Sequence, residues 1–367
     1  MTCFHPITVW QNTKADLYTP PQQYYKDKKV QFQWKDSKYR REITIPCGHC
    51  LGCRLDHANM WATRIAMESK NWKNNCFVTL TYNTPNLPLS EKGLMTLRKK
   101  DIQDFMKRLR YYEKGKESWI NPINGKIENP IRYFMCGEYG PKGGRPHYHM
   151  AIFNWQPNDL ERYKQNKHED WSFTSKTLQK IWGKGFVVIE ELNYNSACYI
   201  ARYVQKKAGL EPKHREYTGK EIEEEKVDER NGEIFIHIKK EVKKQLTETE
   251  QEFIEMSRGV GIGRKYWEDN KDKIKRNKGI LIKIKDKVKL KPIPRYYKKL
   301  WEKENYVEYY RFKYYREKDM IIKKAEIIAQ VILPDGTDEE LKYEFYLNQQ
   351  EQTLKDKAKY LKRNNFI

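Results

Sequence analysis

Apolar and polar residues along the chain follow patterns that predict alternating helices and strands. Residues 54–70 (RLDHANMWATRIAMESK) carry apolar side chains at helical spacing and predict an amphipathic helix. Residues 76–82 (CFVTLTY) are β-branched and aromatic and end at an Asn-Thr-Pro turn, which predicts a buried strand. Residues 94–112 predict a basic helix.

A second group of elements follows along the chain. Residues 131–138 and 147–153 predict two strands, because YGPKGGRP between them supplies the Gly and Pro residues typical of a turn. Residues 185–190 predict another strand, and residues 196–207 predict a helix. Charge alternates over residues 211–250 around Asn231-Gly232, which predicts a solvent-facing hairpin. Strands interleaved with helices predict an α+β fold.

Composition narrows the class of protein. The 367 residues include 72 Lys and Arg against 50 Asp and Glu, a net charge of +22. Hydrophobic residues make up 38%, but 13% aromatic content is too high for a disordered chain. High positive charge together with 26 tyrosines favours a nucleic-acid partner over a merely soluble basic protein, because Lys and Arg contact phosphates and aromatic rings stack on bases.

Two readings are excluded by what the sequence lacks. The longest aliphatic run, at residues 327–333, is far shorter than the roughly 20 apolar residues of a membrane span. The N-terminus MTCFHPITVW has no basic segment followed by an apolar one, so we expect no secretory signal and no membrane partner. Seven cysteines, an odd number with three clustered, indicate a reduced cytoplasmic protein.

His147-Tyr148-His149 lies within a predicted strand. Successive strand side chains alternate between faces, so His147 and His149 project to the same side and suit one divalent metal ion. A hairpin would bring Glu138 alongside them. Two histidines and one carboxylate leave open positions for phosphate oxygens and water, as in a catalytic metal site. The alternative is a pair of strand histidines with ordinary hydrogen bonds.

Residues 199–206 (YIARYVQK) carry two tyrosines four positions apart on a predicted helix. The apolar face of this helix comprises Ala197, Ile200, Ala201 and Val204. Tyr199, Tyr203 and Lys206 share a different face, which indicates a role outside the core. A tyrosine hydroxyl with a pKa of about 10 is a poor nucleophile at neutral pH. A metal ion that polarises a phosphate, with Lys206 nearby, would make its attack feasible.

These motifs occur in the order found in a known family. FVTLTYN (77–83), GEYG (137–140), RPHYHMAIF (145–153) and YIARYVQK (199–206) together resemble HUH endonucleases of the rolling-circle initiator type. With an N-terminal CxxCxxC and a later SRGVGIG, the pattern looks like the replication initiator of microviruses, in the gokushovirus branch. The resemblance covers about residues 47–265.

The resemblance implies an antiparallel sheet with flanking helices and the histidines on a central strand. It implies Mg²⁺ or Mn²⁺ held by His147 and His149, with Glu138 a looser match for a third ligand. Tyr199 and Tyr203 would cut one DNA strand at the origin through phosphotyrosine intermediates, leaving a free 3′-OH, and Lys206 would position phosphate. The implied partners are single-stranded or supercoiled phage origin DNA and the host helicase and polymerase, in the host bacterial cytoplasm.

The cysteine cluster Cys47-x2-Cys50-x2-Cys53 is a separate feature. Thiolates at this spacing can surround a tetrahedral Zn²⁺ but need a fourth ligand. We expect that ligand to be Cys3, with His57, His49 and His5 as rivals. The alternatives to structural zinc are a redox-sensitive cluster, plain packing or an iron–sulfur cluster.

Other segments admit two interpretations each. Arg145, Arg202 and Lys207 are candidates for DNA phosphate contacts, although a turn arginine is as readily solvated. The SRGVGIGR loop can present amides to DNA or form a tight turn. The tyrosines after residue 295 can stack on single strands or form a small helical core.

The sequence therefore predicts three parts. These are an N-terminal cysteine segment (1–57), an endonuclease domain (58–268) with the charged hairpin inserted at about 211–250, and a basic aromatic region (269–367) as a possible DNA-binding extension. The predicted function is a metal-dependent single-stranded DNA nickase and strand transferase of phage rolling-circle replication. The alternatives are a non-catalytic zinc-containing nucleic-acid-binding protein, or an HUH transposase or plasmid initiator.

Overall fold

The computed structural model describes residues 3–12, 30–31, 40–113, 119–120, 127–128, 131–140, 143–165, 171–207, 221–227, 234–240, 249–284 and 287–365. Within them, the helices are α2 (Leu51–Ser69), α3 (Lys99–Tyr112), α4 (Lys176–Trp182), α5 (Tyr194–Lys207), α6 (Arg264–Arg276), α7 (Arg295–Glu304), α8 (Tyr306–Gln330) and α9 (Glu339–Asn365). None of the described helices combines the length and the apolar character that a membrane-spanning segment requires.

The fold is built around an antiparallel sheet, which is seven-stranded within the described residues. Its order is β14 (Phe253–Met256), β7 (Arg132–Tyr139), β8 (Pro146–Phe153), β4 (Asn75–Tyr82), β11 (Gly185–Glu190), β10 (Trp171–Ser175) and β9 (Leu160–Gln165). The strand β8 lies inside the sheet, between β7 and β4. The predicted α+β architecture, an antiparallel sheet with flanking helices, is confirmed.

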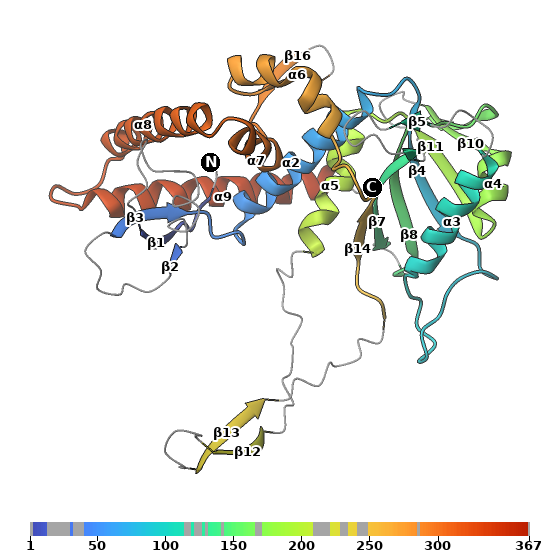
Figure 1. The fold of residues 1–367 in the computed structure, drawn as a ribbon, viewed down its shortest axis with the longest axis horizontal. Helices are drawn as coiled ribbons and strands as arrows, with labels where there is room; N and C mark the ends of the chain where they lie inside the picture. The colour runs from blue at the N-terminus through green and yellow to red at the C-terminus, as the bar shows by residue number, and fades with distance from the viewer. Residues whose placement is uncertain are drawn as a thin grey trace.

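Helices cover both faces of this sheet (Figure 1). On one face, α2 and α5 pack against β4, β7 and β8 through a core that includes Ile65, Phe77, Ala151 and Ile200. On the other face, α3 and α4 pack against a second core. Alternation along β8 explains the division, because its odd-numbered residues face α2 and α5 while Tyr148, Met150 and Ile152 face α3 and α4.

Smaller sheets complete the described structure. The strands β1 (Ile7–Asn12), β2 (Val30–Gln31) and β3 (Arg40–Ile45) form one sheet, and the pairs are β5 (Trp119–Ile120) with β6 (Ile127–Glu128), β12 (Glu221–Val227) with β13 (Ile234–Lys240), and β15 (Ile280–Ile284) with β16 (Lys287–Lys291). β12 and β13 pair antiparallel within the predicted hairpin segment, whereas Asn231-Gly232 lies outside the described residues.

The helix predicted over residues 94–112 begins later, at Lys99. The reason is tertiary. The backbone N–H of Leu97 donates to the Tyr139 hydroxyl at 3.0 Å, and that of Arg98 donates to the Tyr148 hydroxyl at 2.9 Å. Met95 forms an isolated bridge with Leu89. These long-range contacts hold residues 95–98 in a non-helical path that helical periodicity alone did not reveal.

The Gly-rich segment turns toward the interior. The Gly263 N–H donates to Glu68 Oε2 at 2.6 Å, and the Gly263 carbonyl accepts from the Tyr297 hydroxyl at 2.6 Å. Gly263 has φ of +78°, and a Cβ there would lie 2.5 Å from the Tyr297 hydroxyl. The segment is therefore a tight turn that joins α2 to the C-terminal helices, and α6 begins directly after it.

The tyrosines and tryptophans of the C-terminal region divide between core and surface. Tyr297 and Trp301 on α7 are buried in the core shared with α2. On α8, Tyr314 and Tyr315 are 43% and 60% exposed. The helical-core interpretation therefore holds for α7, while α8 keeps aromatic side chains on the surface.

Candidate active site

The register of β7 and β8 brings a carboxylate to the histidine pair. Glu138 pairs directly with His147, so both side chains lie on the face of the sheet that carries α2 and α5. The same carboxylate oxygen, Glu138 Oε1, lies 2.7 Å from His147 Nε2 and 2.8 Å from His149 Nε2. The ligand-type atoms of the three residues all lie within 4.8 Å of one another.

The other ring nitrogen of each histidine is held by a partner. His147 Nδ1 lies 3.1 Å from the Arg145 carbonyl, and His149 Nδ1 lies 3.0 Å from Thr79 Oγ1. When Nδ1 carries the proton, Nε2 presents its lone pair toward Glu138, the tautomer that metal-binding histidines adopt. Two imidazole nitrogens and a carboxylate oxygen form a donor set that fits a divalent metal ion.

The electrostatics of the cluster agree with this donor set. Burial opposes ionisation of Glu138, but the hydrogen bonds with His147 and His149 outweigh it and lower the pKa of the carboxyl group. Burial lowers the pKa of His149 and favours its neutral form. For His147 burial acts in the same direction, yet the bonds to Glu138 and to the Arg145 carbonyl raise its pKa. Metal binding at His147 would therefore displace a proton.

Tyr199 reaches the cluster from α5. Ala197, Ile200 and Ala201 bury the apolar face of the helix, which turns Tyr199 toward the sheet edge of that core. Its hydroxyl lies 3.4 Å from His149 Nε2, and its ring meets the His149 ring edge-on at 4.9 Å between centroids. The side chain remains 38% exposed. A phosphate that approaches the histidines would thus be within reach of this hydroxyl.

Other predicted residues of α5 are described only in part. The backbone of Tyr203, Lys206 and Lys207 belongs to α5, but their side chains lie outside the described part of the structure. Arg202 is exposed on the same helix.

Arg145 has a structural partner. Its Nε and an Nη atom donate to the Tyr82 carbonyl at 3.2 and 2.9 Å, which ties the turn between β7 and β8 to the end of β4. The guanidinium group is half-buried, at the end of the sheet that carries His147.

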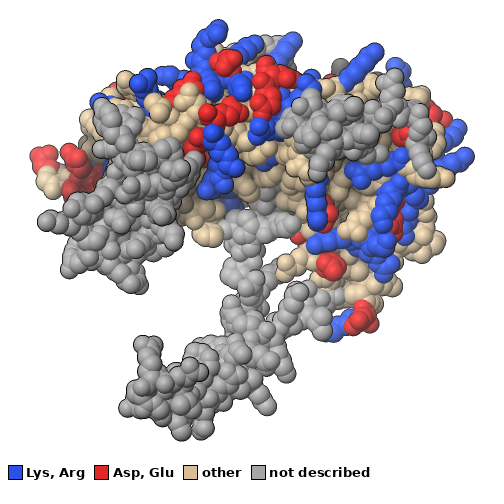
Figure 2. Space-filling view, in the orientation of Figure 1, with Lys and Arg blue, Asp and Glu red and all other residues tan. Residues whose placement is uncertain are grey.

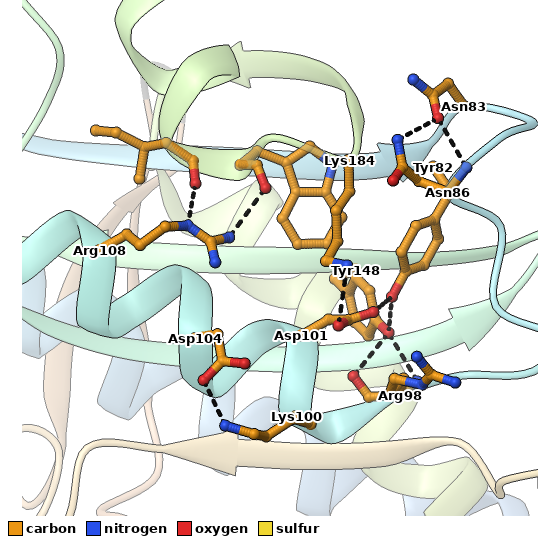
Figure 3. Close-up of polar contacts among 12 residues, drawn as sticks. Tyr82, Asn83, Asn86, Arg98, Lys100, Asp101, Asp104, Arg108, Tyr148 and Lys184 are labelled. Carbon is orange, nitrogen blue, oxygen red and sulfur yellow. Dashed lines mark hydrogen bonds and ion pairs between the residues drawn. The ribbon is translucent and has the colours of Figure 1, made fainter.

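The residue between the histidines anchors their strand to the opposite layer (Figure 3). The hydroxyl groups of Tyr148 and Tyr82 lie 2.8 Å apart, and Tyr82 donates to Asp101 Oδ2 on α3 at 2.7 Å. Lys184 lies 3.3 Å from the same carboxylate. Burial raises the pKa of Tyr148 to about 12, so it stays protonated as a hydrogen-bond donor. This network fixes β8 against α3 and thereby fixes the direction of both histidines.

Positive charge also covers the helix on that opposite face. Figure 2 shows Lys and Arg gathered over α3, whose exposed basic residues are Lys99, Lys100, Lys107 and Arg108. The basic surface therefore extends beyond the histidine face.

The second cluster of metal-type ligands is formed by cysteines. Cys3, Cys47, Cys50 and Cys53 bring their sulfur atoms within 4.8 Å of one another. The Sγ distances are 3.7 Å for Cys3 to Cys47, 4.0 Å for Cys47 to Cys53 and 4.0 Å for Cys50 to Cys3. Tetrahedral Zn²⁺ with bonds of about 2.3 Å separates its sulfur ligands by about 3.8 Å, so these distances fit zinc.

Backbone N–H groups point at these sulfur atoms. Phe4 and Cys53 direct their N–H groups at Cys50 Sγ, at 3.3 and 3.4 Å. Burial opposes ionisation of Cys50, but these N–H groups and the neighbouring thiols lower its pKa to about 6. Such bonds favour the thiolate, the form that binds zinc.

The rival histidines lie outside the four-sulfur cluster. His5 pairs with Glu351 of α9 at 2.9 Å, and His49 is exposed. Burial lowers the pKa of His57, which is half-buried on α2. The remaining cysteines, Cys76 and Cys136, are buried, and Cys198 is half-buried.

Sequence reasoning missed Thr79 as part of the site. Its hydroxyl orients His149, and the signal lay in the TLT of the predicted strand 76–82, where Thr79 and Thr81 share one face. That signal needs the pairing of β4 with β8, which puts Thr79 opposite His149.

Comparisons with known proteins agree on one family. Residues 75–208 match the family model of the replication-associated protein ORF2. The chain is 30% identical over 367 residues to replication-associated protein ORF2 of Spiroplasma virus 4, covering 99% of this chain and 98% of the relative. It is 31% identical to replication-associated protein VP4 of Bdellovibrio phage phiMH2K, over 56% of this chain and 58% of the relative. It is 32% identical to replication-associated protein ORF4 of Chlamydia phage 1, over 44% and 38%. No solved structure matches the chain.

Proposed function

The chain belongs to the family of phage replication-associated proteins, and on this premise we propose that it is a metal-dependent nickase and strand transferase for single-stranded DNA. In this proposal it initiates and terminates rolling-circle replication of phage DNA. The substrate is the origin, single-stranded or in supercoiled DNA, and the free 3′-OH it leaves is extended by the host polymerase with the host helicase, in the host cytoplasm.

One observation carries the catalytic part of the proposal. The two histidine Nε2 atoms converge on one Glu138 oxygen, and the Tyr199 hydroxyl lies 3.4 Å from one of those nitrogens. A site that only binds nucleic acid has no need of a metal-type donor set beside a half-exposed tyrosine hydroxyl. This favours a nickase over a non-catalytic zinc-containing binding protein.

The chain's own residues then have distinct roles. His147, His149 and Glu138 would hold Mg²⁺ or Mn²⁺, which when bound would polarise the scissile phosphate. Tyr199 forms the bond from its hydroxyl oxygen to phosphorus, while the bond from phosphorus to the 3′ oxygen breaks. The proton lost by the tyrosine is balanced by the proton gained by the 3′ oxygen, and the 5′ phosphate stays on the enzyme as a phosphotyrosine. Attack by a 3′-OH on that phosphotyrosine reverses the step and rejoins DNA.

Neighbouring residues of α5 complete the proposal. Tyr203, one helical turn from Tyr199, would act as the second nucleophile, so that one tyrosine holds DNA while the other cuts. Lys206 would position phosphate, and Arg145, Arg202 and Lys207 would contact the DNA backbone.

The cysteine cluster would hold a structural Zn²⁺. The sulfur separations and the N–H groups directed at the sulfurs support this assignment. In this proposal the cluster belongs to an N-terminal segment (1–57) that precedes the endonuclease domain (58–268), and residues 269–367 form a basic extension.

The test is formation of a covalent adduct, scored on denaturing gels. Purified protein is mixed with single-stranded origin DNA and Mn²⁺ or Mg²⁺, beside Tyr199→Phe, Tyr203→Phe, the double variant and His147→Ala. We expect a metal-dependent protein–DNA band that disappears in the double variant and in His147→Ala. Binding of origin DNA with no band in any lane would overturn the nickase and leave the binding protein. Dependence on Tyr199 alone would favour a single-tyrosine HUH transposase or plasmid initiator.

A further inference from the structure

We propose that Phe186 is a platform on which a base of the single-stranded DNA stacks, beside the phosphate that is cut. The proposal rests on the nickase function above and specifies how the substrate is held. It begins from an exposed aromatic ring on an interior strand of the sheet. Phe186 is 61% exposed, although β11 lies between β4 and β10.

The face that carries Phe186 is the histidine face. Val187 and Ile189 of β11 are 3% and 2% exposed in the core beneath α3 and α4. Strand side chains alternate, so Phe186 and Val188 project to the opposite face, which holds the metal-type cluster. The rigid burial of their neighbours fixes this direction.

The register puts Phe186 in one row with a histidine. Phe186 pairs with Thr81 of β4, and Thr81 pairs with His147 of β8. Neighbouring strands lie about 4.8 Å apart, so the backbones of Phe186 and His147 are separated by about 10 Å. The small Thr81 side chain lies between them, so the row has a low middle with the histidine on one side and the ring on the other.

A cation lies at the same end of this row. Arg145 donates to the Tyr82 carbonyl, and Tyr82 pairs with Gly185, the residue before Phe186. Gly185 permits a close approach of the strands, because a Cβ there would lie 2.3 Å from the Thr81 carbonyl oxygen. An exposed ring, a guanidinium group and a metal-type cluster on one face match the base, backbone and scissile phosphate of a single strand.

Single-stranded DNA is the ligand that this chemistry favours. Every base has a flat face that stacks on an aromatic ring, whereas paired bases of a duplex present only their edges. A ring about 10 Å from the cluster would engage a base close to the scissile phosphate rather than a distant one. The platform would therefore select an unpaired segment at the nick site and hold its backbone over the histidines.

The test measures binding and stacking apart from cutting. The probes are single-stranded 20-mers from the DNA that carries the gene for this chain, with 2-aminopurine at successive positions. They are titrated against a Tyr199→Phe/Tyr203→Phe parent and against the parent with Phe186→Ala, Phe186→Trp or Tyr111→Ala. Tyr111 is the matched control, since it is 75% exposed on α3, at the opposite face of the sheet. Melting curves check that each variant folds.

We expect quenching of 2-aminopurine at one position next to the nick site. Phe186→Ala should remove that quenching and weaken binding roughly 5- to 100-fold, while Phe186→Trp retains both and Tyr111→Ala changes neither. Unchanged affinity and quenching in Phe186→Ala would overturn the platform. Adduct formation is scored separately with both tyrosines present. A protein that stacks its probe but forms no adduct contradicts the nickase and not the platform.

Discussion

Glu68 joins three segments of the fold, and removing its carboxylate should be costly. It lies on α2 with only 3% of its side chain exposed. Oε1 lies 2.8 Å from Arg132 Nε on β7 and accepts from Trp72 Nε1 at 3.2 Å, and Oε2 accepts from the Gly263 N–H at 2.6 Å. The carboxylate thus binds α2, the sheet and the Gly-rich turn together.

The magnitude follows from the groups that Glu68→Ala leaves behind. Arg132 is 5% exposed, and a buried charge that loses its partner costs about 3–5 kcal/mol. The buried Gly263 N–H without an acceptor adds about 1–3 kcal/mol. We expect a loss of roughly 4–6 kcal/mol in the free energy of unfolding, a large part of the about 5–15 kcal/mol typical of a folded domain.

Urea denaturation followed by circular dichroism measures this loss. Glu91→Ala is the matched control, because Glu91 is exposed and its removal should change the free energy by no more than about 0.5 kcal/mol. In the double variant Glu68→Met/Arg132→Met both charges are absent, so it should be more stable than Glu68→Ala. A loss below about 1 kcal/mol in Glu68→Ala, or a double variant less stable than the single one, would refute the reasoning.

Further predictions concern zinc, pH and the approach of β11 to β4. Cys3→Ser should lower the zinc content measured by mass spectrometry, whereas His57→Asn should leave it at the parent level; equal content in both would contradict the four-sulfur site. Burial, with the charge of Arg316, lowers the pKa of Lys298 from 10.5 to about 8. Between these values the unfolded chain binds a proton that the folded chain does not, so stability should rise with pH, and Lys298→Met should flatten that rise in urea titrations. Gly185→Ala should destabilise the fold by about 2–4 kcal/mol, because its Cβ would meet the Thr81 carbonyl, and an unchanged melting temperature would contradict that packing.

Local patterns were sufficient for the elements that depend on their own residues. The strand predicted over residues 185–190 has the bounds of β11, and the helix predicted over 196–207 lies within α5. Period-two alternation put both histidines on one face, and the turn between the strands put Glu138 opposite His147. The family resemblance drawn from these motifs is confirmed by the comparisons.

Long-range contacts account for what the sequence did not reveal. The start of α3 depends on hydroxyl groups of Tyr139 and Tyr148, some 40 to 50 positions away in the chain. The exposed β9 and the short β10 have no hydrophobic alternation to announce them. Thr79 orients His149 only because β4 pairs with β8, and strand pairing between distant segments leaves no mark in either segment alone.

Peptide mass spectrometry of the covalent adduct tests the central claim most directly. The protein is incubated with origin DNA and Mn²⁺, digested with nuclease and protease, and searched for peptides that carry a nucleotide. The account predicts a 5′-phosphonucleotide on Tyr199 or Tyr203, within the peptide that contains YIARYVQK, and its absence from His147→Ala. A nucleotide found on any other residue, or adducts that persist in His147→Ala, would contradict the site described for this chain.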